Sequence, residues 1–480
     1  MNDPISPDSG KLSFKTKLAY GAGDMGPGIT ATLLVFSLLI FLTNVAGLRP
    51  GLAGAVLLIG KISDAINDPI IGVLSDRTKS RWGRRHSWML WGSIPFGLFF
   101  SLQWVVPHFS ANTEINQWAL FAYYTLIAVL FNIAFTAVNL PYTALTPELT
   151  QDYNERTSLN SFRFAFSISG SILALAIGGL SSNWFENPSQ QYLAIGLGCA
   201  VLSVLPLYWC VWGTEERYTS EAAEQIPILE QVKIALSNRP FLFVIGIYLC
   251  SWLAFQLTAA IIPYYVTSWM KQDAYFQVAL LVQVVAIIML FVWSSISERI
   301  GKRMVYFMGM SLWIIAQSGL FFLQPGQIVG LYVLSMMAGV GVATAYLIPW
   351  SMLPDVIELD ELKTGKRREG IFYAFMVFLQ KMGLALGLFL VGLALESTGF
   401  ISSTPGEAPP IQPDSALLAI RIAIGPLPTL ILLVGLLLAY FYPISREVHA
   451  EILLKLRERR LGLENTTHHA PPQMDVLDEE

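Results

Sequence analysis

The sequence predicts an all-α membrane protein whose chain crosses the bilayer about twelve times. Hydrophobic residues make up 54% of the 480 residues and charged residues only 13%, whereas a soluble domain carries about 25% charged residues. The mean hydropathy is +0.54. About twelve apolar segments are long enough to span a bilayer, which requires roughly 20 residues of helix.

The predicted spans form two sets of six on either side of a polar stretch. The first set comprises residues 18–45, 51–75, 88–107, 116–146, 159–183 and 191–213. The second set comprises residues 241–268, 274–296, 304–324, 327–353, 370–399 and 415–442. We therefore divide the chain into an N-terminal half, a central loop, a C-terminal half and a charged tail, at residues 1–213, 214–240, 241–444 and 445–480.

Basic residues gather in the connections at one end of the predicted bundle. They follow the second, eighth and tenth spans, at Arg77, Lys79, Arg81, Arg84, Arg85, Arg299, Lys302, Arg303, Lys363, Lys366, Arg367 and Arg368. The connections at the opposite end carry mainly Arg49 and Lys271. Because positive charge favours the cytoplasmic side, the central loop, the tail and both termini are predicted to be cytoplasmic.

A short pattern recurs after the second span of each predicted half. Ser75-Asp76-Arg77 precedes Gly83-Arg84-Arg85, and Ser297-Glu298-Arg299 precedes Gly301-Lys302-Arg303. The positive-inside rule alone also places basic residues in both loops, but the matching position and the acid before each basic run favour an internal repeat. Two parallel six-helix halves, related by an axis along the membrane normal, are the arrangement of major facilitator transporters, and this is the fold we predict.

Four polar residues interrupt the second predicted span. Lys61, Asp64 and Asp68 are spaced by three and then four residues, which places them on one face of a helix, and Asn67 lies beside them. Ionisable groups at membrane depth usually face a bundle interior or a water-filled cavity, and carboxylate and amide oxygens suit hard cations such as Na+. The stretch therefore predicts a cation site. The alternative is a structural lysine–aspartate pair that only ties two helices together.

The sequence does not indicate enzyme or cofactor chemistry. The three cysteines, Cys199, Cys210 and Cys250, lie in or beside apolar segments at spacings that match no metal motif. None of the five histidines lies well inside a predicted span, and the sequence contains no nucleophile motif or phosphate-binding glycine loop. We therefore predict neither an enzyme nor a protein with a bound cofactor.

Several motifs from the first to the eleventh predicted span share one family pattern. They are Lys17-Leu-Ala-Tyr-Gly-Ala-Gly, Asp64-Ala-Ile-Asn-Asp68-Pro, Ser80-Arg-Trp-Gly-Arg-Arg, Leu140-Pro-Tyr-Thr-Ala-Leu-Thr-Pro, Asn154-Glu-Arg-Thr and the single residue Lys381. On these motifs the chain resembles the glycoside–pentoside–hexuronide:cation symporters, whose best-known members are the melibiose permeases. The resemblance covers nearly the whole chain and implies a multi-pass symporter of the major facilitator fold in a cell (inner) membrane. The vertebrate sodium-dependent lysophospholipid transporters share this fold and several of the motifs.

The resemblance implies a cation site and a coupling lysine. The family's cation ligands fall on Asp64, Asn67, Asp68 and Thr136, and its eleventh-helix lysine falls on Lys381. A lysine beside paired carboxylates substitutes for the charge of the cation or helps to couple the two ligands. Lys61, on the face of the two aspartates, is assigned to the same coupling group. The expected coupling ion is Na+, with H+ or Li+ as alternatives.

Substrate-binding residues are expected at Asp24, Asn139, Tyr142, Arg163 and Tyr346. The two acids that hold galactosyl hydroxyls in the melibiose permeases fall here on Gly28 and Asn139, so the resemblance does not imply melibiose as the substrate. Asp24 either compensates for the missing acid or faces the inner vestibule. Arg163 either pairs with a buried acid or a substrate group or anchors its helix at the interface. The two tyrosines either stack on a sugar or belong to the core.

Charged clusters at the cytoplasmic end are predicted to act as a gate. Arg84, Arg85 and Glu155 belong to these clusters, and ion pairs within them are expected to close the inner side in the outward-open state. The alternative is solvated charge that only sets the topology, because exposed ion pairs contribute little individually.

We therefore predict a cation-coupled secondary active symporter that moves a sugar or glycoside-like solute by alternating access. Its partners are a small-molecule substrate, a monovalent cation and membrane lipid, and not nucleic acid. Two alternatives remain. One is a transporter of lysolipids or other amphiphiles on the same scaffold, and the other is a non-transporting sensor that signals through the charged tail.

Overall fold

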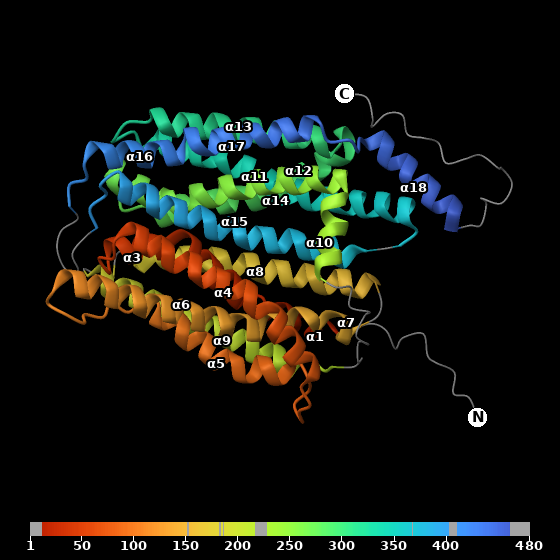
Figure 1. The fold of residues 1–480 in the computed structure, drawn as a ribbon, viewed down its shortest axis with the longest axis horizontal. Coiled ribbons are helices and arrows are strands. Elements are labelled where there is room, and N and C mark those ends of the chain that lie inside the picture. Colours follow the sequence, from red (N-terminus) through yellow and green to blue (C-terminus); the bar gives the residue numbers. More distant parts are fainter. Residues whose placement is uncertain are drawn as a thin grey trace.

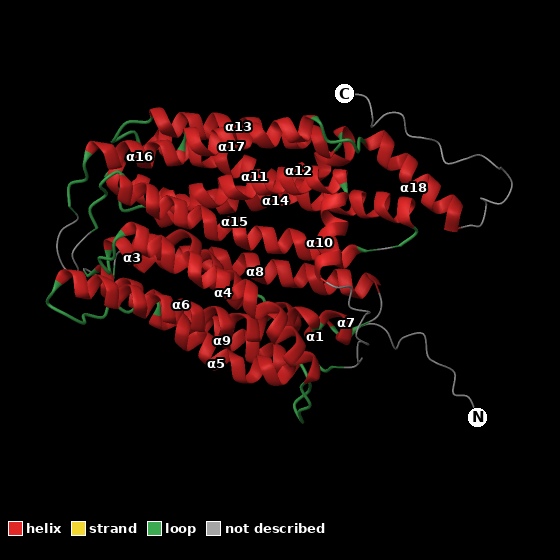
Figure 2. Cartoon of the chain, viewed as in Figure 1, coloured by secondary structure: helices red, strands yellow, loops and turns green. Residues whose placement is uncertain are grey.

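The described part of the chain is helical throughout its regular elements. The computed structural model describes residues 12–150, 153–181, 184–185, 187–216, 228–366, 368–402 and 410–460, and Figure 2 shows helices and loops in these ranges without any strand. Much of the predicted central loop and the acidic end of the tail lie outside the described residues. Within the described ranges, ten helices are long and apolar enough to cross a membrane, which confirms the prediction of an all-α polytopic membrane protein.

The predicted count of twelve spans is not confirmed. The two further candidates are α4 (Pro50–Arg77) and α5 (His86–Leu102). The middle of α4 carries Lys61, Asp64 and Asp68, and α5 has only 17 residues, slightly fewer than the roughly 20 that span a bilayer. Both nevertheless occupy the positions of the second and third predicted spans.

The first predicted span is broken into four pieces. These are α1 (Phe14–Ala22), α2 (Met25–Leu33), the π-helical turn η1 (Leu34–Leu38) and α3 (Leu39–Asn44). The break between α1 and α2 falls at Gly23 and Asp24, where a Cβ on Gly23 would lie 2.4 Å from the Tyr142 ring. The N-terminal half continues with α4, α5, α6 (Thr113–Ala144), α7 (Thr146–Leu149), α8 (Tyr153–Ser181) and α9 (Pro188–Gly213).

The remaining helices belong to the C-terminal half, except α10 in the predicted central loop and α18 in the predicted tail. These are α10 (Ile228–Ser237), α11 (Arg239–Tyr264), the π-helical turn η2 (Tyr265–Trp269), α12 (Tyr275–Ile300), α13 (Lys302–Phe322), α14 (Ile328–Thr364), α15 (Glu369–Ser397), α16 (Asp414–Ile424), α17 (Pro426–Tyr440) and α18 (Arg446–Arg460). The tenth predicted span ends at residue 353, whereas α14 continues to Thr364. Its extension carries Asp355 and Asp360, which pair with Lys302 and Arg368.

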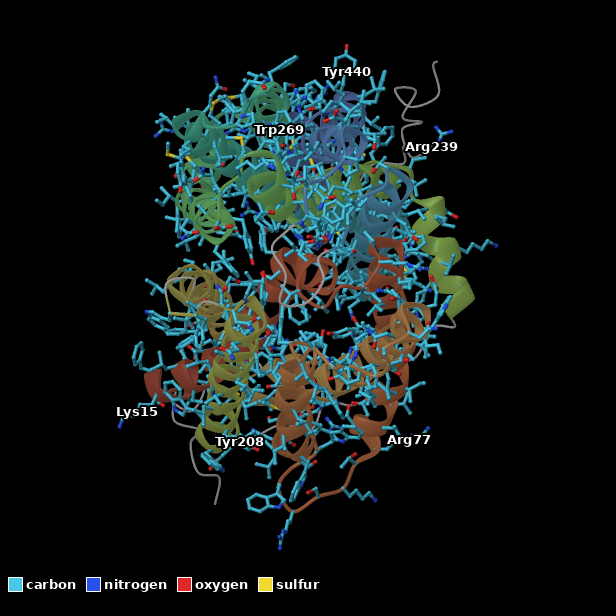
Figure 3. The ribbon with its side chains drawn as sticks, turned by 90° about the vertical axis from the view of Figure 1, so that its left-hand side faces the viewer. Lys15, Arg77, Tyr208, Arg239, Trp269 and Tyr440 are labelled. Atoms are coloured by element: carbon cyan, nitrogen blue, oxygen red, sulfur yellow. The ribbon has the colours of Figure 1, made fainter. Side chains whose placement is uncertain are left out.

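The helices assemble into two groups that lie side by side. Figure 1 shows α1–α9 in one group and α11–α17 in the other, and Figure 3, turned by 90°, shows many of the helices nearly end-on. The described chain begins with α1 and ends with α18 at the same end of the bundle (Figure 1). We call this end, where α4 finishes and α15 starts, the inner end, and the opposite end the outer end, after the predicted orientation.

The two halves are in close contact at the outer end. Helices α4 and α15 cross where Gly54 faces Gly392, and a Cβ on Gly392 would lie 2.4 Å from the carbonyl oxygen of Pro50. Small residues let two helix backbones approach in this way. Four hydrogen-bonded pairs reinforce the contact: Thr43 with Tyr264, Tyr192 with Tyr275, Ser402 with the carbonyl of Leu48, and the N–H of Gly51 with Glu396. These contacts close the outer end between the halves.

Candidate cation and substrate site

The charged face of α4 lies in the middle of the bundle. The Asp64 side chain is fully buried, whereas about a third of the Asp68 side chain is exposed. Lys61 lies one turn before Asp64, with its Nζ 3.6 Å from Asp64 Oδ2, and donates to Asn132 Oδ1 on α6 at 3.2 Å. The predicted common face of the helix therefore brings one ammonium and two carboxylates together, as the spacing requires.

Residues of two other helices complete this cluster. Thr136 Oγ1 on α6 lies 2.9 Å from Asp64 Oδ1 and 3.2 Å from Asp68 Oδ1. Lys381 Nζ on α15 lies 2.5 Å from Asp68 Oδ2 and 3.2 Å from Asp64 Oδ2. Asp64 Oδ2 is buried and has no hydrogen bond of good geometry in the described structure. The Lys381 ammonium thus lies where both carboxylates reach it, at the boundary between the halves.

The cluster is balanced in charge. Two lysines and two aspartates carry two positive and two negative charges, which lowers the cost of placing them at membrane depth. Asn67 is less directly involved, because its amide nitrogen donates to Ser63 Oγ, one turn away on the same helix, at 3.0 Å. The oxygens around the Lys381 ammonium come from Asp64 and Asp68, and Thr136 supports both of them.

The residues predicted for substrate binding separate into two environments. Asp24 is buried and accepts from Arg163 Nε at 3.2 Å, so these two charges neutralise each other within the N-terminal half. Tyr142 is fully buried, stacks on Tyr20 and donates to the carbonyl of Tyr20. Of the two alternatives for Tyr142, this conformation has core packing, because the glycine-lined break after α1 brings Tyr20 against the ring. Substrate binding by Tyr142 stays a prediction. Asn139 lies on α6, about one turn after Thr136, and is half-buried.

Aromatic side chains of the C-terminal half form a continuous wall around Tyr346. The Tyr346 ring contacts Trp252 and Phe255 at centroid distances of 6.0 and 5.3 Å. Tyr248 connects Trp252 to Trp350, which stacks on the half-exposed Tyr373 of α15. Two buried polar atoms of the wall on α11, Trp252 Nε1 and Gln256 Oε1, have no hydrogen-bond partner among the described residues.

The sequence analysis did not single out the α11 side of this wall. Tyr248, Trp252 and Gln256 recur at four-residue intervals, which places them on one helix face. That spacing is the signal that points to them. In an apolar span the same spacing is also typical of ordinary core packing, so the sequence alone does not distinguish a binding wall from a packed core.

The predicted gating residues form ion pairs within the N-terminal half. Arg84 and Arg85 both contact the buried carboxylate of Glu148, at 2.5 and 3.0 Å. Arg85 also pairs with Asp76, and Lys17 pairs with Glu155 at 3.0 Å. These pairs tie α4, α5, α7, α1 and α8 together and do not bridge the two halves in this conformation. Their gating role remains a prediction.

A carboxylate after α9 secures the loop between α4 and α5. Glu216 accepts hydrogen bonds from the backbone N–H groups of Arg84, Arg85 and His86, at 2.7 to 2.8 Å. His86 Nδ1 lies 3.2 Å from the same carboxylate, and its Nε2 bonds with the Thr214 hydroxyl. Burial by itself raises the pKa of Glu216, but the hydrogen bonds from the His86 ring and the three N–H groups outweigh it and lower the pKa to about 2.

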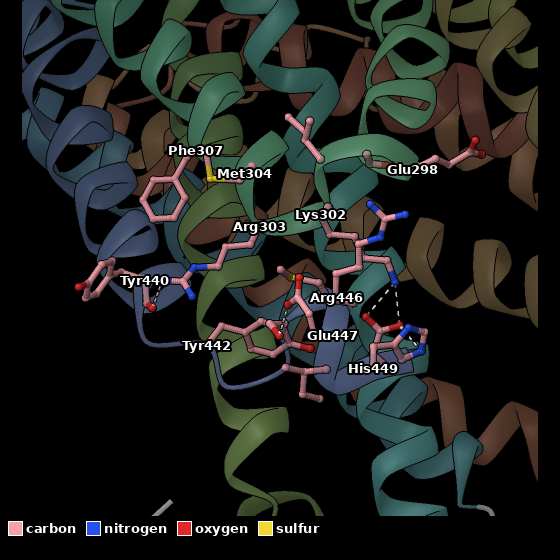
Figure 4. Close-up of a pocket in the computed structure, with 17 residues that line it drawn as sticks. Glu298, Lys302, Arg303, Met304, Phe307, Tyr440, Tyr442, Arg446, Glu447 and His449 are labelled. Atoms are coloured by element: carbon pink, nitrogen blue, oxygen red, sulfur yellow. Dashed lines mark hydrogen bonds and ion pairs between the residues drawn. The ribbon is translucent and has the colours of Figure 1, made fainter. Parts of the chain in front are cut away.

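A second charged cluster lies at the inner end of the C-terminal half. It borders a cavity of about 690 Å³, and Figure 4 shows the side chains of Lys302 and His449 ending close together at its edge. His449 Nε2 on α18 lies 2.7 Å from Glu358 and 3.3 Å from Asp355. Such a group offers ligand atoms for a metal ion, but Lys302 Nζ already contacts both Asp355 oxygens, at 2.7 and 2.8 Å. The lysine supplies the positive charge, and the cluster attaches α18 to α14.

Known proteins resemble this chain along most of its length. Residues 19–446 match the family described as MFS/sugar transport protein. An uncharacterized symporter of Synechocystis is 52% identical, over 94% of this chain and 98% of its own. A protein of Escherichia coli that is provisionally named a glycoside/cation symporter is 29% identical, over 86% of this chain and 88% of its own length. The mouse sodium-dependent lysophosphatidylcholine symporter 1 is 28% identical, over 91% of this chain and 87% of its own length.

Solved structures support the same fold. The crystal structure of a D-xylose-proton symporter superimposes with a TM-score of 0.64 at 15% identity, over 89% of this chain and 97% of that chain. Together with the match of residues 19–446, this confirms the predicted major facilitator fold and the predicted transporter class. The protein therefore belongs to the MFS/sugar transport family, and it is a multi-pass membrane transporter and not an enzyme.

Proposed function

We propose that the protein is a symporter that couples the entry of a sugar or glycoside-like solute to a monovalent cation, with Na+ as the first choice. The carrying observation is that Asp64 Oδ2 and Asp68 Oδ2 converge on one point between the halves, which the Lys381 ammonium occupies. Thr136 Oγ1 bonds the other oxygen of each carboxylate. Carboxylate oxygens, with a hydroxyl oxygen beside them, are the kind of donor that a hard cation prefers. H+ and Li+ remain alternatives for the same site.

In this mechanism Na+ and the Lys381 ammonium compete for the two carboxylates. Lys381 Nζ lies 2.5 Å from Asp68 and 3.2 Å from Asp64, so an ion bound to both oxygens requires the ammonium to withdraw. Lys381 belongs to α15 and the aspartates to α4, so the exchange alters a direct contact between the two halves. Cation binding is thereby linked to their relative position, and by linkage the substrate and the cation change each other's affinity by the same factor.

The proposed transport step is a rocking of the halves about this site. The closed outer end must open. This requires α4 to separate from α15 where Gly54 meets Gly392. It also requires Glu396 to release the N–H of Gly51. Rigid-body rocking of two six-helix halves around a central site is the alternating access of this fold. The cation and the solute then cross together, and neither is chemically altered.

A sugar-like solute is proposed because of the aromatic wall. Four of its residues in the C-terminal half are partly exposed, and their rings contact neighbouring rings: Trp252, Tyr346, Trp350 and Tyr373. Sugar rings stack on such faces while a few polar groups bind the hydroxyls, and Trp252 Nε1 and Gln256 Oε1 are polar atoms still without partners in the described structure.

Sodium binding to the purified protein tests the coupling before any substrate is known. We expect Na+, and not K+, to raise the midpoint of thermal unfolding of the wild type in a saturable manner. Asp68→Asn should abolish this response, whereas Asp273→Asn, which removes an exposed acid from the loop before α12, should retain it. A wild type that responds equally to Na+ and K+ would refute Na+ coupling, and a pH-jump assay of the same variants would then test H+.

A lysolipid or another amphiphile is the second candidate for the solute. It is favoured by the mouse relative, whose name assigns it sodium-dependent transport of lysophosphatidylcholine. An uptake assay separates the two candidates. It measures the uptake of a fluorescent lysolipid into proteoliposomes in a Na+ gradient. Methyl glucoside is the competitor in one series, and unlabelled lysolipid is the competitor in another.

A further inference from the structure

A basic cavity lies at the inner end of the C-terminal half, apart from the central cluster. It has a volume of about 880 Å³ and lies between α10, the start of α11 and the end of α14. Its charged lining consists of four basic and two acidic side chains: Lys233, Arg239, Lys363, Arg368, Glu230 and Asp360. None of these residues belongs to the proposed cation and solute site, so the cavity is a separate feature of the molecule.

Ion pairing leaves this cavity with a surplus of positive charge. Asp360 accepts hydrogen bonds from two nitrogens of the Arg368 guanidinium, at 2.6 and 2.9 Å, so these two charges cancel. Lys233, Arg239 and Lys363 are exposed and have no ion pair among the described residues. The other acid of the lining lies on α10 and is also exposed. Three positive charges therefore remain against one negative charge, and the cavity attracts an anionic group.

The orientation of α10 places the cavity at the edge of the membrane. Figure 1 shows α10 running across the bundle near its inner end, at a steep angle to α11 and α14, so its axis lies along the membrane surface. Leu236 on this helix is 59% exposed, whereas Ala235 is buried. Figure 3 shows the Arg239 side chain extending outward at the periphery of the bundle. A helix in this orientation with apolar and basic side chains is typical of contact with lipid headgroups.

Apolar side chains complete the lining of the cavity. Ile234, Pro240 and Leu359 contribute from α10, α11 and α14. A small soluble anion needs only the basic side chains, whereas the glycerol and the first methylene groups of a lipid also bury apolar surface. Basic pockets between helices at the cytoplasmic side of a membrane protein bind the headgroups of anionic lipids. The combination of charge, apolar lining and position therefore favours a lipid as the occupant.

We propose that this cavity binds the headgroup of an anionic membrane lipid, such as phosphatidylglycerol. Lys233 on α10 and Lys363 on α14 bind the phosphate through charge-assisted hydrogen bonds. Arg239 adds a third positive charge at the rim. The bound lipid connects α10, which belongs to the predicted central loop, to the end of α14. This proposal does not depend on the cation coupling proposed above.

Retention of lipid by the purified protein tests the proposal. The protein is reconstituted with equal amounts of phosphatidylglycerol and phosphatidylcholine, and native mass spectrometry then counts the lipids of each kind that remain bound. We expect phosphatidylglycerol to be retained over phosphatidylcholine by about tenfold or more, with a smaller preference at high salt. Glycerol phosphate at the same concentration, a headgroup without acyl chains, should not displace the lipid. Displacement by it would identify a site for soluble phosphates and overturn the lipid assignment.

Variants distinguish this cavity from general attraction to a basic surface. Lys233→Gln combined with Lys363→Gln should reduce the preference by about fivefold for each lysine. Lys79→Gln combined with Arg299→Gln, which removes two exposed basic residues elsewhere at the inner end, should leave it unchanged. An equal loss in both double variants, or no loss in the first, would overturn the assignment to this cavity. The midpoint of thermal unfolding verifies that each variant is folded, and a missing Na+ response would count only against the proposed function.

Discussion

Replacing Gly392 with alanine should force the two halves apart at the outer end. An added Cβ would lie 2.4 Å from the carbonyl oxygen of Pro50 and 3.0 Å from the Cα of Gly54, whereas ordinary contact begins at 3.4 Å. The neighbouring atoms belong to the backbone of α4, so no side-chain rotation relieves the overlap. Helix α4 must therefore move by about 1 Å, and overpacking of this kind costs about 1–3 kcal/mol.

This penalty applies only while α4 and α15 touch, so it acts on the conformational equilibrium. A bias of about 1–3 kcal/mol changes the ratio of the two conformations by about 5- to 150-fold. The expected result is a shift from the structure described above, with a closed outer end, towards an outward-open one. Because the cation site lies between the same two helices, the contact of Lys381 with Asp64 and Asp68 should loosen at the same time.

Distances between spin labels measure the shift directly. One pair, at Ala111 and Ile411, reports on exposed loop positions of the two halves at the outer end, and a second pair, at Lys79 and Lys366, reports on the inner end. In Gly392→Ala the outer distances should lengthen and the inner distances should shorten.

Two further glycines provide a graded control for this experiment. A Cβ on Gly54 would lie 3.0 Å from the carbonyl oxygen of Phe389, so Gly54→Ala should produce a smaller shift. A Cβ on Gly370, on the same helix as Gly392, meets nothing within 4 Å, so Gly370→Ala should leave both distances unchanged. Unchanged distances in Gly392→Ala, in protein that remains folded, would refute the conclusion that this contact holds the outer end closed.

Three further predictions concern the inner end of the N-terminal half. Glu148→Gln removes the buried carboxylate that Arg84 and Arg85 share, which leaves Arg84 without this partner and Arg85 with Asp76 alone. The free energy of unfolding should therefore fall by about 3 kcal/mol; a thermal midpoint equal to wild type would contradict this. Hydrogen bonds lower the pKa of Glu216 from 4.5 to about 2, so its ionised form stabilises the fold. The stabilisation should be complete above about pH 4.5 and disappear as the pH falls towards 2, and in an acid titration Glu216→Gln should lack this component. Replacing Arg84 and Arg85 together by glutamine should change the rate of solute uptake without preventing membrane insertion, and an unchanged rate would contradict the gating role.

The sequence predicted the central cluster well because helix periodicity is a local property. The spacing of Lys61, Asp64 and Asp68 alone places them on one face of α4. The pairing of Asp68 on this face with Thr136 and Lys381 joins residues that are 68 and 313 positions apart along the chain. Spacing does not encode such contacts, and these two residues are assigned to the site by family resemblance and not by physical reasoning.

Tyr142 shows what sequence reasoning left undecided. An aromatic residue in an apolar span has the same local pattern whether its ring faces a cavity or a neighbouring helix. Its burial is decided by the break at Gly23, which brings the first helix against the ring and the Arg163 side chain above it. The ion pairs of Arg84 and Arg85 are a similar case, because charge patterning predicts which end they occupy but not that both contact Glu148.

Composition and apolar length by themselves determined that this chain is a polytopic helical membrane protein, because the bilayer requires long apolar helices whose backbone groups bond within each helix. Charge placement predicted which end faces the cytoplasm, and periodicity predicted a charged face on α4. Only the tertiary structure decided that Lys381 lies between Asp64 and Asp68, that Asp24 is neutralised by Arg163, and that the halves meet at Gly54 and Gly392. These features depend on how distant helices pack, where a shift of about one ångström separates a contact from a clash.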